Sequence, residues 1–76
     1  MEDLIAILKE IRPGQDFVGV DDFFAQGVLD SLDLTAMVTA LEARYDVFVD
    51  VEEIVPRNFR SLASIQEFLA QHGVAV

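Results

Sequence analysis

An apolar stripe at helical spacing in residues 31–45 constrains the fold of this chain more than any other feature. Apolar side chains recur there every three or four residues, which is the period of a helix that packs on one side. The stripe consists of Leu34, Met37, Val38, Leu41 and Tyr45. Asp30, Ser31 and Asp33 stand at its start, where polar or negative groups favour a helix N-terminus. The pattern predicts a helix over residues 31–45.

Two further apolar patterns predict a helix on each side of this one. Near the start of the chain, apolar residues at helical spacing predict a helix over residues 2–11, which Pro13 and Gly14 would end. The residues that recur at this spacing are Leu4, Ile5, Leu8 and Ile11. Near the other end, Ser61 is expected to cap a last helix that ends near Gly73. Its inward residues are Leu62, Ile65, Phe68 and Leu69.

The two connections between these helices carry different patterns. Residues 12–30 contain too many apolar side chains for a solvated linker, so we expect Phe23 or Phe24 to pin this loop to the bundle. A helical turn is expected at residues 21–25, with its first residue, an aspartate, as the cap. The segment YDVFVDV, residues 45–51, alternates like a strand. Because no second strand-like segment could pair with it, we predict an extended connection there.

The fold that follows from these elements is all-α. Residues 51–54 are expected to form a short third helix, which Pro56 would end. The chain has no cysteine and one histidine, His72, so neither a disulfide nor a zinc site of cysteine and histidine can brace it. We therefore predict a single domain over residues 1–76, a small four-helix bundle with an apolar core, a long loop between the first two helices and a short third helix.

Negative charge is concentrated in the middle of the chain. The formal net charge is −9, and residues 16–53 carry a single positive side chain, Arg44. Nucleic acids and anionic lipids need clustered Lys and Arg, so we expect no nucleic acid among the partners. A basic protein surface is the better candidate. Acidity that merely keeps a small domain soluble explains the same charge equally well.

Two other classes of protein are disfavoured by the sequence. The acidic pairs at residues 21–22 and 52–53 lack the spacing of a calcium loop, so no metal site is predicted. No apolar run approaches the length of a membrane span, and the start, MEDLIAILKEIRP, lacks the basic segment of a signal peptide. We therefore expect a soluble, cytoplasmic protein without membrane insertion.

Ser31 stands out between Asp30 and Leu32 at the predicted start of a helix. Serine catalysis requires a histidine base within reach, whereas His72 is expected at the frayed end of the last helix, and an exposed Asp30 is too weak a base. No catalytic residue is therefore predicted, and we expect no enzyme. Two interpretations of the serine remain: a helix cap, which stabilises by about 1 kcal/mol, or a hydroxyl presented for attachment of a phosphate-linked group, whose charge a helix N-terminus tolerates.

The segment Gly27-Val28-Leu29-Asp30-Ser31-Leu32 resembles the phosphopantetheine attachment motif of the acyl and peptidyl carrier protein family. The resemblance extends over nearly the whole chain, through LEARYDVFVDVEEIVP after the second helix and NFRSLASIQEFL near the end. It implies that a phosphopantetheinyl transferase moves 4′-phosphopantetheine from coenzyme A to Ser31, and that Asp30 helps to position that transferase. The thiol of this arm would then hold an acyl or aminoacyl group as a thioester.

The resemblance also implies partner enzymes and a surface that meets them. A discrete carrier of this kind is a non-catalytic monomer, which an adenylating or other acyl-loading enzyme charges and a downstream acyltransferase or condensing enzyme discharges. We expect its contact face to include Val28, Leu29, Leu32, Thr35, Ala36 and Thr39. The acidic residues expected to steer the partners are Asp33, Glu42, Glu52 and Glu53.

One departure from the family pattern concerns the type of cargo. Thr35 and Ala36 stand where carriers of fatty acid synthesis commonly have Val and Glu, so this face is more neutral. The motif is more similar to discrete carriers of aminoacyl groups, which include D-alanyl carriers and the stand-alone carriers of nonribosomal peptide and polyketide-type pathways. The alternative function is an unmodified helical protein–protein interaction module with a carrier-like fold.

Overall fold

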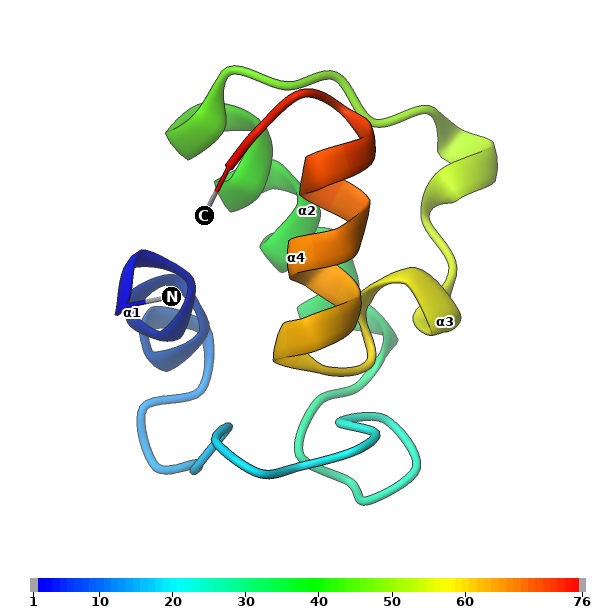
Figure 1. Cartoon of the computed structure of the whole chain (residues 1–76). Coiled ribbons are helices and arrows are strands. Elements are labelled where there is room, and N and C mark those ends of the chain that lie inside the picture. The colour runs from blue at the N-terminus through cyan, green and yellow to red at the C-terminus, as the bar shows by residue number, and fades with distance from the viewer. Residues whose placement is uncertain (1, 76) are drawn as a thin grey trace.

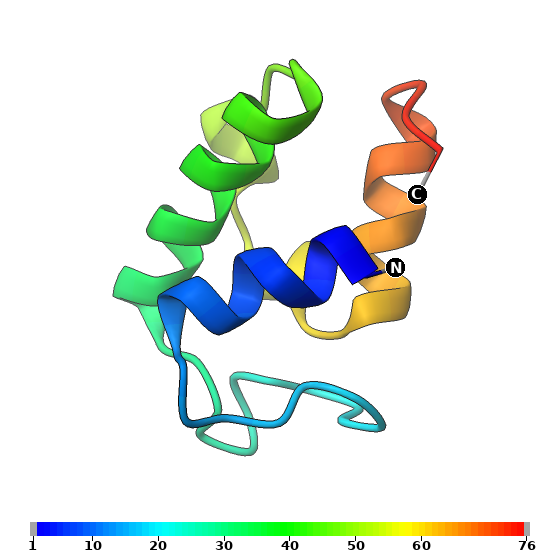
Figure 2. The same ribbon diagram turned by 90° about the vertical axis from the view of Figure 1, so that its left-hand side faces the viewer.

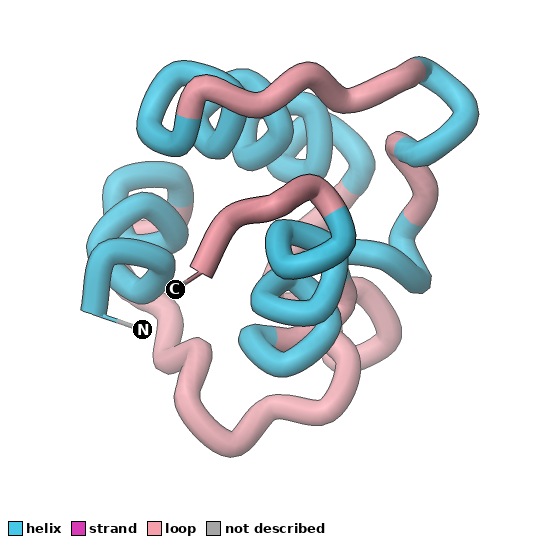
Figure 3. The backbone as a smooth tube through the Cα atoms, turned by 45° about the horizontal axis from the view of Figure 1, so that its top comes forward, coloured by secondary structure: helices cyan, strands magenta, loops and turns pink. Residues whose placement is uncertain are grey.

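The computed structural model describes residues 2–75 of the chain. These residues contain four α-helices and one short 3-10 helix, and no strand occurs among them (Figure 3). The elements are α1 (Glu2–Ile11), α2 (Ser31–Tyr45), η1 (Val51–Glu53), α3 (Pro56–Phe59) and α4 (Leu62–Gln71). The predicted all-α bundle is confirmed, and so are the predicted bounds of its first two helices. Among residues 2–75, none of the helices combines the length and the apolar character of a membrane span.

The helices enclose one apolar core. α1 packs against α2, and α3 packs against both α2 and α4. Figure 2 shows α1 crossing the molecule, with α2 on one side of it and α4 on the other. The core consists of Leu4, Ile7, Leu8, Phe17, Phe23, Leu29, Leu34, Met37, Val38, Leu41, Val49, Phe59, Ile65, Phe68 and Leu69. No polar or charged residue in the described part of the chain is fully buried, so apolar burial holds the bundle together.

Residues 12–30 form a long loop along one end of the bundle (Figures 1 and 2). Phe23 is fully buried and meets Phe17 edge to face, with ring centroids 5.4 Å apart. The backbone of Phe23 is fixed as well, because its N–H donates to the Arg60 carbonyl (2.6 Å) and its carbonyl accepts from the Leu29 N–H (3.0 Å). The prediction that a phenylalanine pins this loop to the bundle is confirmed.

The helical turn predicted inside this loop is present, but its cap differs from the expectation. The Gln26 N–H donates to the Asp22 carbonyl (3.1 Å), which closes one helical turn, and Asp22, not Asp21, is the residue that caps it. A carboxylate oxygen of Asp22 accepts hydrogen bonds from the N–H groups of Phe24 and Ala25, both at 3.0 Å. Two adjacent aspartates offer the same side chain, and the local backbone decides which of them reaches these groups.

The second connection leaves the opposite end of α2 (Figure 1). Asp46 follows the helix in the left-handed conformation, with φ of 54°. Residues 47–50 then run without regular structure, as predicted, and Val49 turns inward to the core. The Val49 N–H donates to a carboxylate oxygen of Glu42 (3.0 Å), which fixes the connection against the helix it leaves. The helical turn predicted at residues 51–54 is present as the 3-10 helix η1.

Pro56 begins α3, so the prediction that it ends a helical turn is wrong. Proline suits the first position of a helix because the N–H that it lacks has no partner there. The start of α4 is as predicted, since the Ser61 hydroxyl accepts a hydrogen bond from the Ser64 N–H (3.1 Å). Phe59 lies between these two helices in the core and meets Phe68 with ring centroids 4.8 Å apart.

His72 is ordered by its neighbours, whereas the sequence suggested a frayed position. It follows the last turn of α4, and its Nδ1 donates to the Phe68 carbonyl (3.0 Å). Its Nε2 lies 3.3 Å from the Glu53 carboxylate on η1. The Phe68 carbonyl, followed by the Glu53 carboxylate, raises the pKa of His72 above its ordinary value, because both favour the protonated ring. The histidine therefore joins α4 to the second connection.

Candidate functional site

Ser31 is the first residue of α2, and it is exposed next to Leu32, whose side chain is 81% exposed. The interpretation of Ser31 as the helix cap is wrong, because the cap is Asp30. Asp30 has the extended backbone of a capping residue, with φ of −124° and ψ of −174°, and its side chain accepts from the third N–H of the helix. Within residues 2–75, the Ser31 hydroxyl takes part in no hydrogen bond. Its oxygen is available for chemistry.

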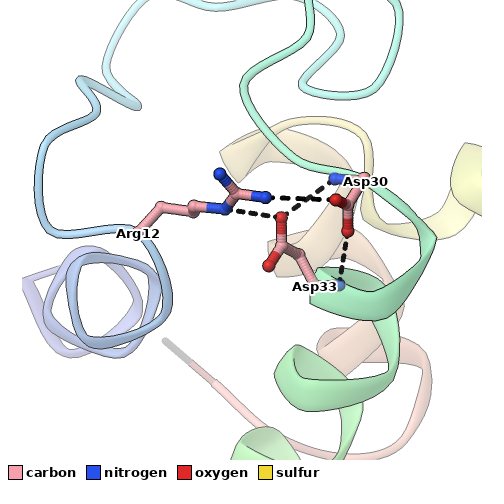
Figure 4. Close-up of polar contacts among 3 residues, drawn as sticks. All are labelled: Arg12, Asp30 and Asp33. Carbon is pink, nitrogen blue, oxygen red and sulfur yellow. Dashed lines mark hydrogen bonds and ion pairs between the residues drawn. The ribbon is translucent and has the colours of Figure 1, made fainter.

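Asp30 and Asp33 close the start of α2 by a reciprocal pair of hydrogen bonds. Oδ1 of Asp30 accepts from the Asp33 N–H, and Oδ2 of Asp33 accepts from the Asp30 N–H, both at 3.0 Å (Figure 4). This arrangement is a capping box, which satisfies two backbone donors that a helix start would otherwise leave unpaired. The peptide that carries Ser31 is therefore held between two fixed residues.

Arg12 joins this capping box from the end of α1. Its Nε donates to Oδ2 of Asp33 (2.8 Å), and its Nη2 donates to Oδ2 of Asp30 (3.1 Å) (Figure 4). Arg12 follows the last residue of α1, so the guanidinium bridges the two ends of the long loop. No local pattern in the sequence predicts this contact, because Asp33 and Asp30 lie 21 and 18 positions from Arg12.

The electrostatics of the cap keep Asp30 ionised. The Asp33 N–H holds the pKa of Asp30 below its ordinary value; desolvation opposes this effect, and the positive charge of Arg12 adds to it. A fixed, negative carboxylate therefore stands next to the Ser31 hydroxyl at neutral pH. The positive end of the α2 dipole lies at the same place.

The predicted contact face is partly an exposed surface and partly core. Leu32, Thr35, Ala36 and Thr39 are exposed along α2. The prediction that Leu29 belongs to this face is wrong, because its side chain is 3% exposed and packs in the core.

Val28, the other loop residue predicted for this face, is half-buried and packs against the core as well. The neighbouring residue Gly27 has a positive φ of 75°, so the chain turns sharply just before Val28. In such a turn, successive side chains no longer follow the regular spacing of a helix or a strand. Sequence alone therefore does not separate a buried from an exposed residue at positions 28 and 29.

Three of the four acidic residues predicted to steer partners also hold the fold. Asp33 belongs to the capping box, and the Glu42 carboxylate accepts from the backbone of the second connection. The Glu53 carboxylate accepts from the Asp50 N–H (3.1 Å). Glu52 is exposed on η1. The spacing D-x-x-D at residues 30–33 and D-x-x-E at 50–53 could have signalled the contacts of Asp33 and Glu53, because it is the spacing of a capping box.

The second connection carries apolar surface that the sequence reasoning missed. Phe48 is 73% exposed and Val51 is 85% exposed, and both lie in the segment that follows α2. Alternation in YDVFVDV could have signalled Phe48, because Val49 points inward and its neighbour therefore points outward. It does not account for Val51, which lies two residues from Val49 and begins η1. No group of three or more acidic or histidine side chains within the described residues is arranged to hold a metal ion.

Comparison with known proteins identifies a family. The family described as "Phosphopantetheine attachment site" matches residues 2–70, which include all four helices but for the last residue of α4. No curated protein and no solved structure matches the chain. Members of the matching family attach 4′-phosphopantetheine covalently, and the exposed serine at the start of α2 lies inside the matched range. The chain belongs to the phosphopantetheine attachment family, that of the acyl and peptidyl carrier proteins.

Proposed function

We propose that Ser31 is the attachment residue and that this chain carries acyl or aminoacyl groups between enzymes as a discrete carrier protein. The observation that carries the proposal is the exposed Ser31 hydroxyl, which has no hydrogen-bond partner within residues 2–75 and stands at the start of α2. The chain has three serines, and the other two bond to each other, with Ser61 Oγ and Ser64 Oγ 3.0 Å apart. Ser31 is therefore the serine whose modification disturbs no contact.

The residues around Ser31 fit a phosphate-linked group. A phosphodiester adds one negative charge, and the N-terminal end of a helix favours negative charge through its backbone N–H groups and dipole. Because Asp30 supplies the cap, a substituent on the Ser31 oxygen leaves the capping hydrogen bonds in place. When attached, the arm supplies a terminal thiol that can hold an acyl or aminoacyl group in thioester linkage.

In the attachment step the Ser31 oxygen forms a bond to the phosphorus that bears the pantetheine of coenzyme A. The bond from that phosphorus to the bridging oxygen of the pyrophosphate breaks, and 3′,5′-adenosine diphosphate leaves. The hydroxyl proton passes to a base of the transferase. Asp30 contributes a fixed carboxylate beside the reacting oxygen, which the transferase can recognise. The chain itself needs no catalytic residue for this step.

Partners are expected to meet the exposed side of α2. Leu32, Thr35 and Thr39 form a surface next to Ser31 on which successive enzymes can dock. The hydroxyls of both threonines donate to carbonyls of their own helix, at 3.4 and 3.1 Å. Their polar groups are therefore used within α2, which leaves a neutral surface. Such a surface supports an aminoacyl cargo, loaded by an adenylating enzyme, in a D-alanyl-type or natural-product pathway of the cytoplasm.

The net charge of −9 supports weak and rapid contacts with these enzymes. Long-range attraction raises association rates without a large buried interface, which suits a monomer that several enzymes must bind in turn. A transferase, a loading enzyme and a downstream acyltransferase or condensing enzyme are the expected partners.

The test is intact mass after incubation with coenzyme A and a broad-specificity phosphopantetheinyl transferase. We expect the wild type to gain one phosphopantetheine, Ser31→Ala to gain none, and Ser64→Ala, the matched control, to gain one. Absence of any gain in the folded wild type, with a transferase that modifies a known carrier, would overturn the proposal. That outcome would favour an unmodified interaction module, to which the exposed Phe48 and Val51 would then point.

A further inference from the structure

The Arg12 side chain bridges the two ends of the long loop before Ser31. Arg12 is the first residue of the loop and Asp30 is the last, and the two are joined by an ion pair of 3.1 Å. The same guanidinium reaches Asp33 inside α2 at 2.8 Å, and the Asp33 side chain is only 13% exposed. Figure 4 shows the guanidinium lying between the end of α1 and the start of α2. Ser31 directly follows Asp30, so it lies next to this ion pair.

Both carboxylate oxygens and the backbone N–H of Asp30 have a hydrogen-bond partner. One carboxylate oxygen accepts from the Asp33 N–H, the other accepts from Arg12, and its own N–H donates to Asp33. The Asp30 side chain is 55% exposed, so without Arg12 it has room to rotate into solvent. Without Arg12, the Asp30 and Asp33 carboxylates have no cation between them, and their like charges repel, which favours this rotation.

We propose that Arg12 is a positioning residue for the loading of Ser31. It acts through Asp30, which it fixes in the orientation that the phosphopantetheinyl transferase binds, and it touches neither coenzyme A nor the Ser31 oxygen. This inference rests on the proposed function of Ser31 as the attachment residue. It adds a requirement that the attachment motif does not contain, because Arg12 lies outside residues 27–32.

The expected effect is on recognition of the carrier. If the fraction of molecules with a correctly placed Asp30 falls to about one fifth, the apparent affinity of the transferase for the carrier falls about fivefold. The KM for the carrier should rise by that factor while kcat stays unchanged, because a bound carrier has its Asp30 held by the enzyme. A merely structural role would change the melting temperature without this division between KM and kcat.

The chain offers a matched control at the other end of the same helix pair. Arg44 on α2 forms an ion pair of 2.7 Å with Asp3 on α1, and both side chains are more than half exposed. Arg44→Gln removes the same charge and the same kind of inter-helix contact as Arg12→Gln, at the end of α2 away from Ser31. Any effect of net charge on the transferase is common to both variants.

The experiment measures initial rates of loading as the carrier concentration varies, for the wild type, Arg12→Gln, Arg12→Lys and Arg44→Gln. We expect the KM of Arg12→Gln to be about fivefold above that of Arg44→Gln, with equal kcat. The KM of Arg12→Lys should lie between wild type and Arg12→Gln, because lysine keeps the charge but not the two-armed geometry. Circular dichroism confirms that each variant is folded.

Two results would overturn the inference while leaving the attachment residue intact. The first is a KM of Arg12→Gln equal to that of Arg44→Gln. The second is a fall in the kcat of Arg12→Gln as large as the rise in its KM, which would indicate a disturbed fold and not a misplaced Asp30. A wild type that gains no mass at all would instead contradict the proposed function itself, so the two failures are distinguishable. If Arg12→Gln is unfolded, the comparison of Arg12→Lys with wild type decides.

Discussion

Helix α2 is tied to α1 at both of its ends, and the two ties use the same kinds of side chain. At the start of α2, Arg12 reaches two carboxylates, and the Asp33 side chain is only 13% exposed. At the end of α2, Arg44 reaches the single carboxylate of Asp3, and both of these side chains are more than half exposed. The first tie is also part of a capping box, whereas the second is an isolated surface pair, which contributes little to stability.

The connections that meet these two ends differ in the same way. The loop before α2 buries Phe17 and Phe23, and its ends are bridged. The connection after α2 leaves Phe48 and Val51 exposed. The two connections therefore use their phenylalanines differently. The end of α2 that carries Ser31 is fixed by polar contacts and by buried aromatic rings, whereas Phe48 at the other end stays on the surface. Apolar exposure occurs at both ends, since Leu32 beside Ser31 is 81% exposed.

The largest effect is expected from removing one phenylalanine from each connection. Phe23→Ala removes a side chain with 0% exposure, so the free energy of unfolding should fall by about 3–5 kcal/mol. Phe48→Ala removes a 73% exposed side chain, and the change should stay within about 0.5 kcal/mol. Urea denaturation followed by circular dichroism measures both. Equal losses would show that the two connections are packed alike and would remove the contrast.

A smaller effect, of opposite sign at the two ends of α2, is expected from its terminal residues. Asp30→Ala removes the cap and should lower the free energy of unfolding by about 1 kcal/mol. Asp46 has φ of 54°, which glycine adopts without a steric penalty, so Asp46→Gly should raise stability by about 0.5–1 kcal/mol. Thermal denaturation of the two variants beside the wild type measures both signs. A loss of stability in both would mean that the Asp46 side chain holds its end of the helix.

The smallest effects on stability are expected from changes in pH. The two groups concerned, His72 and Asp30, act in different pH ranges. The Phe68 carbonyl and then Glu53 raise the pKa of His72 above 6.5, so its stabilising contribution is complete below pH 6.5 and is lost as pH rises through the raised value. For Asp30, whose pKa is lowered from 3.8 first by the Asp33 N–H, the contribution is present above pH 3.8 and is lost as pH falls through the lower value.

Melting temperatures of the wild type and His72→Gln between about pH 6 and pH 8 test the first of these effects. The wild type should lose stability over this range relative to the variant, because the protonated ring pairs with Glu53 and lies near Asp50. Asp30→Asn should show no such difference in this range, and it serves as the control. Parallel curves for wild type and His72→Gln would show that the ion pair contributes nothing.

The sequence predicted those parts of the fold that depend on neighbours along the chain. The apolar stripe and the acidic start of α2 placed both of its bounds correctly, and Ser61 was correctly predicted to cap α4. Local chemistry was ambiguous where two residues can do the same task. Aspartate and serine are both good caps, so whether Asp30 or Ser31 caps the helix depends on backbone geometry, which cannot be predicted from the sequence here.

The rest depends on contacts between distant residues. Arg12 finds its partners only after α1 and α2 have packed against each other, so no local spacing reveals the tie. Leu29 is buried because the loop turns at Gly27 and follows Phe23, and this path is decided by the core. At the site itself, Ser31 and Asp30 were candidates from the sequence. Arg12, which is proposed to position Asp30, was found only in the folded structure.

The placement of the cap on Asp30, one residue before Ser31, separates folding from the proposed modification. The helix start uses neither the hydrogen nor the oxygen of the Ser31 hydroxyl, so the unmodified chain already has the capping contacts of α2. If Ser31 carries the arm as proposed, attaching the group or removing it by hydrolysis leaves these contacts unchanged. The chain can then pass between its two forms without refolding.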